Sequence, residues 1–138
     1  MQASWFKALV VDDEKIVVEE VAEAISLIGG EVDAFTNPVE CLGFLENAQK
    51  EYDIVIVDLA MPRINGLNFL KVADSLFSNS PRKFIMTGLA EINGKEIESC
   101  LMLTVLHKPL SFGDLREKIG HLLHSETQSR CPSKGGVT

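Results

Sequence analysis

Two kinds of hydrophobic pattern alternate along this chain. The first is a short apolar run, often of β-branched residues, which is typical of a strand buried on both faces of a sheet. The clearest example is Ile54-Val55-Ile56-Val57, which the acidic residue Asp58 follows directly. Segments of this kind predict five strands, at residues 8–11, 31–35, 52–58, 83–86 and 104–107.

The second pattern repeats apolar residues every three or four positions, which is the spacing of an amphipathic helix. Asn37 and Pro38 open one such stretch as N-cap and first helical residue, and Gly29-Gly30 closes another. Ser111 can cap the last helix, with Asp114 near its positive end. The pattern predicts helices at residues 17–28, from residue 38 onward, at 67–76, weakly at 93–101, and at 111–124.

Strand and helix therefore alternate five times. Short apolar strands separated by amphipathic helices predict an α/β fold, with a parallel sheet that helices cover on both faces. No glycine-rich phosphate loop follows a strand, because Gly29-Gly30 comes after a helix. In a parallel sheet the carboxyl ends of all strands meet at one edge, and ligands bind at that edge in open α/β sheets.

The composition fits one globular domain. Of 138 residues 46% are hydrophobic and 24% are charged, and the net charge of −7 argues against a nucleic-acid-binding surface. No apolar run is long enough to cross a membrane and no signal peptide is apparent, so we expect a cytoplasmic protein. We expect a domain at residues 1–124, a disordered polar tail at 125–138, and reduced thiols at Cys41, Cys100 and Cys131.

Five polar residues are expected to meet at the carboxyl edge of the sheet. Asp12 and Asp13 follow the first strand, and Asp58 ends the third. Thr87 ends the fourth strand and Lys108 follows the fifth. Each has a simpler role of its own, because acids cap helices, threonines occur in turns and most lysines are solvated. Their conjunction at one edge is what indicates a site.

Three carboxylates at one edge repel one another and need compensating charge. A divalent cation and Lys108 would supply it, and a few carboxylates with retained waters suit Mg²⁺. A metal-bound carboxylate beside a lysine can accept a phosphoryl group, because both cations offset charge on the phosphoryl oxygens while the acid attacks in line. The product is an aspartyl phosphate, to which Thr87 can donate a hydrogen bond.

Together these segments resemble the response-regulator receiver domain of two-component signalling. The resemblance covers about residues 7–124 and rests on five motifs: VVDDE at 10–14, VDLAMP at 57–62, NG at 65–66, MTG at 86–88 and HKP at 107–109. It implies a flavodoxin-like (βα)5 three-layer sandwich with a parallel five-stranded sheet of order 2-1-3-4-5. It also implies a cis peptide bond between Lys108 and Pro109.

The resemblance assigns roles to individual residues. It makes Asp58 the phosphoacceptor and pairs Lys108 with the phosphoryl group, with Thr87 as the third catalytic residue. The metal ligands that it implies for Mg²⁺ are Asp12 through water, Asp13, Asp58 and the backbone carbonyl of Ala60. In the family, phosphorylation draws the threonine inward and an aromatic residue on the fifth strand rotates.

This chain departs from the family at that aromatic position, where it has Val105. Valine has no ring to swing between buried and exposed sites, so we expect output to pass through the fourth helix and its loops by another packing change. The apolar residues Leu101, Met102 and Leu103 form either a partner or dimer surface or an ordinary part of the core.

The main expectation is a non-enzymatic phosphorelay receiver. Asp58 takes a phosphoryl group from a sensor histidine kinase or phosphotransfer protein, and the phosphorylated form changes its contacts with a downstream protein or a second copy of itself. No direct contact with nucleic acid or membrane is expected. After His124 too little sequence remains for an output domain, so the chain is either a stand-alone regulator or a segment of a larger regulator or hybrid kinase.

Two other functions compete with this expectation. An Mg²⁺-dependent aspartyl-phosphate phosphatase or phosphomutase would use the same nucleophile, but it normally carries a second acid two residues later, where this chain has Ala60. A flavin- or nucleotide-binding domain has little support, because the acids would repel a phosphate group unless a metal intervened.

Overall fold

A five-stranded parallel sheet forms the middle layer of the protein, in a computed structural model that describes residues 6–88 and 103–129, with side chains up to residue 121. The strands lie in the order β2-β1-β3-β4-β5. Their bounds are β1 Phe6–Val11, β2 Gly30–Phe35, β3 Ile54–Asp58, β4 Arg82–Thr87 and β5 Thr104–His107. The strand order that the family resemblance implies is therefore confirmed.

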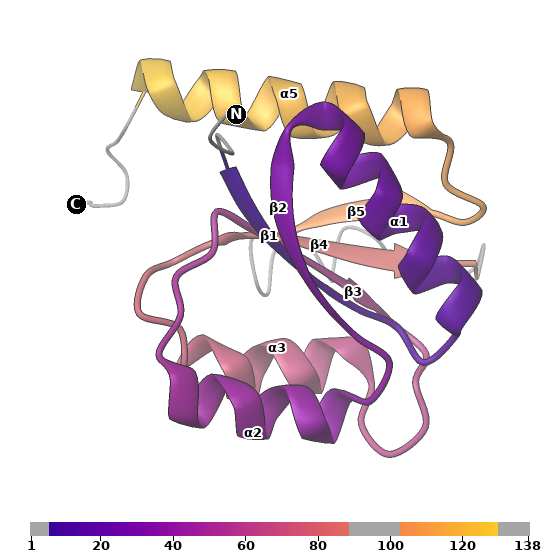
Figure 1. The fold of residues 1–138 in the computed structure, drawn as a ribbon, viewed down its shortest axis with the longest axis vertical. Helices are drawn as coiled ribbons and strands as arrows, with labels where there is room; N and C mark the ends of the chain where they lie inside the picture. Colours follow the sequence, from indigo (N-terminus) through magenta and orange to yellow (C-terminus); the bar gives the residue numbers. More distant parts are fainter. Residues whose placement is uncertain (1–5, 89–102, 130–138) are drawn as a thin grey trace.

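Helices cover both faces of the sheet (Figure 1). The described helices are α1 Lys15–Ile28, α2 Pro38–Ala48, α3 Gly66–Asp74 and α5 Phe112–Ser129. Helices α1 and α5 lie on one face, and α2 and α3 lie on the other. This confirms the predicted α/β three-layer sandwich. The weak helix predicted at residues 93–101 lies outside the described residues.

The predicted strands agree with the observed ones to within two residues at each end. The largest differences are that β1 begins at Phe6 and that β3 begins at Ile54. Tyr52 precedes β3 because its backbone pairs with the side chain of Asn79. The Tyr52 N–H donates to Asn79 Oδ1 (3.2 Å), and Asn79 Nδ2 donates to the Tyr52 carbonyl (2.7 Å).

Helix α5 is longer than the sequence pattern predicts. It continues to Ser129, whereas the prediction ends it at residue 124 and begins a disordered tail there. The first part of that predicted tail is therefore helical. Residues 130–138 lie outside the described residues, and so do two of the three cysteines, Cys100 and Cys131.

Hydrophobic side chains fill the space on both sides of the sheet. All five residues of the central strand β3 are buried. Val55 and Val57 face the core under α2 and α3, while Ile54 and Ile56 face the core under α1 and α5. This alternation follows from the two-residue period of a strand, and each such side chain contributes roughly 1.5–3 kcal/mol. The free thiol of Cys41 lies in the first core, where burial raises its pKa to about 12.

Local caps set several helix ends at the positions that the sequence indicates. Asn37 Oδ1 accepts hydrogen bonds from two backbone N–H groups in the first turn of α2, at 2.9 and 3.2 Å. Ser111 Oγ accepts one from the Asp114 N–H at 3.0 Å. Gly29 follows α1 with a φ of 113°, in the left-handed region that glycine adopts without steric cost.

A network of polar side chains connects the segments near the amino ends of the strands. The Tyr52 hydroxyl donates to Asp33 Oδ2 at 2.7 Å, and Lys50 Nζ lies 3.2 Å from the same oxygen. Burial and the hydrogen bond to Asp33 raise the pKa of Tyr52, so the phenol stays protonated. With Asn79, these side chains join β2 to the segments that precede β3 and β4.

Among the described residues, no helix combines the length and the hydropathy that a transmembrane span requires.

The start of β2 leaves no room for a side chain at Gly30. A Cβ there would overlap the ring of Phe6 and lie 2.8 Å from Ile25 Cγ2. Gly30→Ala is therefore expected to lower the free energy of unfolding by about 1–3 kcal/mol, measured by urea denaturation. Gly43→Ala in α2 is the matched control, because nothing lies within 4 Å of that position and the methyl group should stabilise the helix by about 0.5–1 kcal/mol. Equal stability of the two variants would contradict this packing.

Candidate functional site

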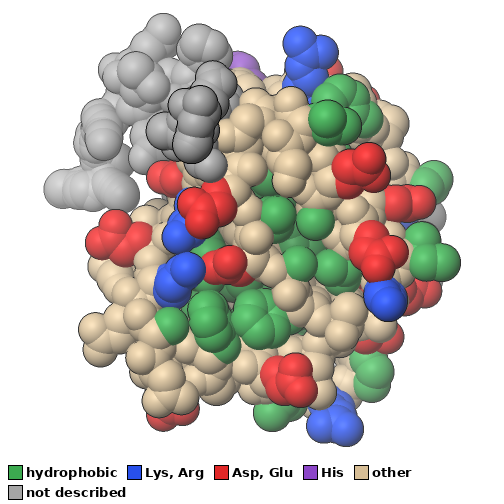
Figure 2. Space-filling view, in the orientation of Figure 1, with side chains coloured by type: hydrophobic (Ala, Val, Ile, Leu, Met, Phe, Trp, Pro, Cys, Tyr) green, Lys and Arg blue, Asp and Glu red, His purple; other side chains and the backbone are tan. Residues whose placement is uncertain are grey.

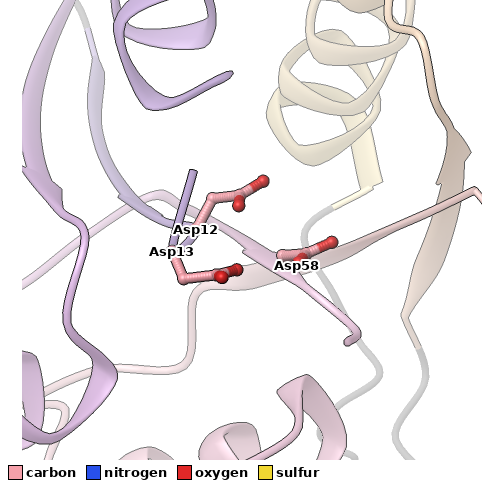
Figure 3. A group of neighbouring side chains, drawn as sticks. All are labelled: Asp12, Asp13 and Asp58. Atoms are coloured by element: carbon pink, nitrogen blue, oxygen red, sulfur yellow. The ribbon is translucent and has the colours of Figure 1, made fainter. Parts of the chain in front are cut away.

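Three carboxylates lie together at the carboxyl edge of the sheet. Asp58 is the last residue of β3, and Asp12 and Asp13 come directly after β1. The two strands pair in parallel with Val11 opposite Val57, so Asp12 lies beside Asp58. Each acid has a carboxylate oxygen within 4.8 Å of those of the other two. Figure 3 shows the three side chains directed into the same space.

The ammonium of Lys108 joins two of these acids. Its Nζ lies 3.0 Å from Asp12 Oδ2 and 3.0 Å from Asp58 Oδ1. The Lys108 N–H donates to the carbonyl of Thr87 at the end of β4 (2.8 Å), and the Lys108–Pro109 peptide bond is cis, as the resemblance implies. Lys108 follows β5, so its side chain reaches across the end of β4 to acids on β1 and β3.

Asp12 is fully buried and holds the chain between β1 and α1. Its Oδ1 accepts a hydrogen bond from the Glu14 N–H at 2.9 Å. Glu14 occupies the N-cap position of α1, so the simpler role of helix cap does not apply to Asp12. The other oxygen, Oδ2, is buried and accepts no aligned hydrogen bond within the described part of the chain, although it forms the ion pair with Lys108.

Burial is the largest influence on the pKa values of Asp12 and Asp58. It raises the pKa of Asp58, Lys108 lowers that pKa, and the charges of Asp12 and Asp13 raise it further. The pKa of Asp12 is also raised by burial, against the lowering effects of the Glu14 backbone hydrogen bond and of Lys108. Burial lowers the pKa of Lys108, but its contacts with Asp12 and Asp58 outweigh burial, so the pKa is raised and the lysine stays charged.

Thr87 and Ala60 lie close to this cluster in the chain topology. Thr87 is buried at the last position of β4, one residue beyond Met86, which pairs with Asp58. Ala60 is exposed and lies in the loop that follows β3. The sheet therefore brings Thr87, Asp58 and Lys108 to the same edge, and Ala60 follows Asp58 by two residues.

Gly66 lets the loop after β3 close against the site. Its N–H donates to the Leu59 carbonyl at 2.8 Å. A Cβ at this position would overlap the carbonyl oxygen of Asp58 and lie 2.9 Å from Ile85 Cδ1. The sequence marks Asn65-Gly66 only as a motif of the family resemblance, because a close approach to a distant backbone atom has no local signature.

The donor set fits a hard divalent cation. All three acids offer carboxylate oxygens, and the buried Asp12 Oδ2 has no aligned hydrogen-bond donor in the described structure. In the part of the chain that the structure describes, one ammonium, that of Lys108, faces the three carboxylates, which leaves an excess of negative charge. Asp13 is exposed, so the cluster is open to solvent on its side. Carboxylates with access to several waters are the environment that Mg²⁺ prefers.

The sequence motifs assign no role to Glu14, an acid that the structure places near Lys108. Glu14 Oε1 lies 3.6 Å from Lys108 Nζ, and its side chain is 65% exposed. The only signal was its place directly after Asp13 in the VVDDE motif. Whether its side chain turns toward the helix or toward Lys108 depends on the geometry at the start of α1, which the pattern does not specify.

For the apolar residues 101–103, the sequence leaves open a partner or dimer surface and an ordinary place in the core. The structure decides between these two interpretations at Leu103. Leu103 is buried in the core under α2 and α3, so it is a core residue and not part of an exposed surface. Val105 is half-buried and packs against the same core. Leu101 and Met102 lie outside the described residues.

Comparisons with known proteins show the family to which the chain belongs. A model of the response regulator receiver domain family matches residues 8–120. The chain is 28% identical over 132 residues to the transcriptional regulatory protein CpxR homolog of Haemophilus influenzae, which covers 92% of this chain and 53% of that protein. It is 25% identical over 120 residues to hybrid signal transduction histidine kinase L of Dictyostelium discoideum, which covers 82% of this chain and 7% of that protein.

A solved structure shows the same fold and the same extent. The receiver domain of the Francisella response regulator 1452 matches with a TM-score of 0.73 at 26% identity, over 89% of this chain and 99% of that one. The chain thus spans nearly a whole receiver domain, but only about half the length, or less, of the two curated relatives.

The raised pKa of Asp58 makes stability depend on pH. Without divalent cations, ionised Asp58 opposes folding at neutral pH, so Asp58→Asn is expected to raise the urea midpoint at pH 7. As pH falls from this raised folded-state pKa toward the unfolded-state value of about 3.9, the folded wild type binds the proton first and regains stability. The advantage of Asp58→Asn should therefore shrink in acid.

The control for this measurement is Glu46→Gln, at an exposed acid on α2, which should show neither effect. A lower urea midpoint for Asp58→Asn at pH 7 would mean that the ion pair with Lys108 outweighs the cost of burial, contrary to the direction given above.

Proposed function

The chain belongs to the response regulator receiver domain family, a signalling module of two-component systems, and from this membership we propose that Asp58 is its phosphoacceptor. Asp58 takes a phosphoryl group from a phosphohistidine of a sensor histidine kinase or phosphotransfer protein, and the phosphorylated form changes its protein contacts. The observation that carries the proposal is the 3.0 Å contact between Asp58 Oδ1 and Lys108 Nζ beside two further acids. It gives a carboxylate nucleophile the neighbouring cation that phosphoryl transfer requires.

The phosphoryl transfer needs no reactant other than the Asp58 carboxylate and the phosphohistidine. A carboxylate oxygen of Asp58 attacks phosphorus in line while the bond from phosphorus to the histidine nitrogen breaks, and the nitrogen keeps the electron pair. The products are an acyl phosphate on Asp58 and a free imidazole. Lys108 exchanges its contact with Asp58 Oδ1 for one with a phosphoryl oxygen, and the Thr87 hydroxyl donates a hydrogen bond to another.

Mg²⁺ is the cation that we propose for the acid cluster. Asp13, Asp58 and the Ala60 carbonyl would hold it directly, and Asp12 would act through a water molecule. When bound, the metal offsets negative charge on the phosphoryl oxygens. The buried Asp12 Oδ2 without an aligned donor among the described residues, and the excess of acids over Lys108, support this choice.

The competing enzymatic function lacks a necessary residue. An aspartyl-phosphate phosphatase would need a general acid two residues after its nucleophile, and Ala60 has no titratable group. We therefore propose that the chain catalyses only its own phosphorylation and dephosphorylation. The curated relatives are longer than this chain, so the proposal applies equally to a stand-alone regulator and to a receiver segment of a larger protein.

A groove beside the site suits a protein phosphodonor. It encloses about 660 Å³ between α1 and the segment from Lys108 to Phe112, so Lys108 belongs both to the groove and to the site. Leu27 and Phe112 line it and are 70% and 44% exposed, and Glu20 and Glu23 lie along it. Figure 2 shows hydrophobic and acidic side chains next to one another over α1. We propose that a helix with apolar and basic residues, carried by the phosphodonor protein, docks here.

The phosphoacceptor role predicts a simple mass change. After incubation with Mg²⁺ and acetyl phosphate, the wild-type chain should gain one phosphoryl group, measured by intact mass spectrometry. Asp58→Asn should gain none, because it removes the nucleophile, and wild type without Mg²⁺ should gain little. The control is Asp53→Asn, at an exposed acid on the amino side of β3, which should be phosphorylated like wild type.

Phosphorylation of Asp58→Asn to the wild-type extent would refute the assignment of Asp58. If wild type gains no phosphoryl group, beryllofluoride, which mimics an acyl phosphate, decides between the remaining explanations. Mg²⁺-dependent binding of beryllofluoride would indicate a receiver that needs its own kinase, and no binding would refute the receiver chemistry. Steady turnover of a generic phosphate ester would favour the phosphatase.

The groove predicts a residue that matters only for a protein donor. Leu27→Ser should slow transfer from a phosphorylated histidine phosphotransfer domain by about tenfold, because it removes an apolar contact at the interface, and should leave acetyl phosphate uptake unchanged. Val72→Ser is the matched control, since Val72 is 46% exposed on α3 on the opposite face of the sheet. Equal effects of the two substitutions on the transfer rate would contradict docking in this groove.

A further inference from the structure

Lys108 has a third acidic neighbour on the outer side of the site. Glu14 Oε1 lies 3.6 Å from Lys108 Nζ, compared with 3.0 Å for the oxygens of Asp12 and Asp58. The Glu14 side chain is 65% exposed, whereas those of Asp12 and Asp58 are 0% and 7% exposed. Glu14 therefore carries its charge on the solvent side of the site.

A backbone hydrogen bond anchors Glu14, and its side chain lies near Lys108. Its backbone N–H donates to Asp12 Oδ1 at 2.9 Å, which anchors the residue where α1 begins. Glu14 is the N-cap of α1, with φ of −92° and ψ of 113°, yet its side chain makes no capping hydrogen bond. Acidic side chains at a helix N-terminus are normally attracted to the free N–H groups there. The side chain lies toward Lys108 instead, so it belongs electrostatically to the site.

The charge of Glu14 acts on molecules that approach Asp58 from solvent. Among the described residues it is a fourth carboxylate near one ammonium, in addition to Asp12, Asp13 and Asp58. A small phosphodonor such as acetyl phosphate carries about two negative charges at neutral pH and makes few other contacts that could offset the repulsion. A phosphohistidine on a partner protein is delivered by an interface whose binding free energy exceeds a repulsion of this size.

We propose that Glu14 is a specificity-determining residue that disfavours small dianionic phosphodonors relative to phosphodonors of lower net charge. The inference rests on the proposed function of Asp58, because it concerns the reaction of that residue. Charges a few ångströms apart at a protein surface interact strongly enough to change a rate by about three- to tenfold at low salt. The selection is electrostatic and requires no contact between Glu14 and the donor.

The test compares the second-order rate constants of phosphorylation of the full chain by two small donors. Acetyl phosphate is a dianion at neutral pH, and phosphoramidate carries about one net negative charge. With Mg²⁺ present and at low ionic strength, Glu14→Gln should accelerate uptake from acetyl phosphate about three- to tenfold and from phosphoramidate about two- to threefold. Both accelerations should fall to less than about twofold in 0.5 M salt, because ions screen the charge.

Glu19→Gln is the matched control. Glu19 lies in the first turns of α1 and is 63% exposed, nearly as much as Glu14, but among the described residues its ion-pair partner is Lys15, at 3.8 Å, and not Lys108. This substitution removes the same charge from the chain without changing the neighbours of the site. It should alter both rate constants by less than about twofold.

Each outcome supports or overturns the inference. Equal rates for Glu14→Gln and wild type would overturn it, and so would equal accelerations by Glu14→Gln and Glu19→Gln. An acceleration that persists in 0.5 M salt, or that is the same for both donors, would also overturn it, because it would show that Glu14 acts by positioning Lys108. Failure of wild type to take a phosphoryl group from either donor, together with no binding of beryllofluoride, would instead overturn the proposed function.

Discussion

Lys108 Nζ lies 3.0 Å from carboxylate oxygens on two different strands, and the carboxyl edge of the sheet depends on these two contacts. The acids come from β1 and β3, while the lysine follows β5, so the ammonium connects three chain segments that are distant in sequence. Asp12 and Asp58 are almost fully buried and would repel each other without it. Removing Lys108 would leave both acids without a compensating charge, a loss that typically costs about 3–5 kcal/mol for a buried pair. The relative positions of these strand ends are therefore constrained by charge as well as by packing.

The same burial that constrains the edge also gives it reactivity. Burial removes most of the water that would otherwise hydrogen-bond to the Asp58 carboxylate. The loss of this hydration disfavours the charged form and raises the pKa of Asp58. The fold offsets the cost elsewhere, in a central strand whose residues are all buried and in two cores on either side of the sheet. Gly66 adds a close backbone contact that only a residue without a side chain permits. The two hydrophobic cores therefore offset the free-energy cost of burying charged groups at the carboxyl edge.

Most of the fold and the inner part of the site could be predicted from the sequence. Strand and helix periods are local properties, and parallel strands bring their carboxyl ends to one edge, so the meeting of Asp58 with Lys108 followed from topology. Three features could not be predicted. The pairing of Tyr52 with Asn79 is a long-range contact. Helix α5 extends past residue 124 through polar residues, because glutamate and glutamine favour helix even where no apolar period continues. The reach of Glu14 to Lys108 depends on one side-chain orientation.

The polar network around Tyr52 has a mechanical meaning for a signalling domain. Hydrogen bonds and an ion pair join Tyr52 to Asp33, Asn79 and, through Asp33, to Lys50, and they connect β2 to the segments that precede β3 and β4. Side-chain contacts therefore join the segments that precede β3 and β4 to β2, in addition to the backbone pairing of the strands, and limit how far these segments can move relative to one another.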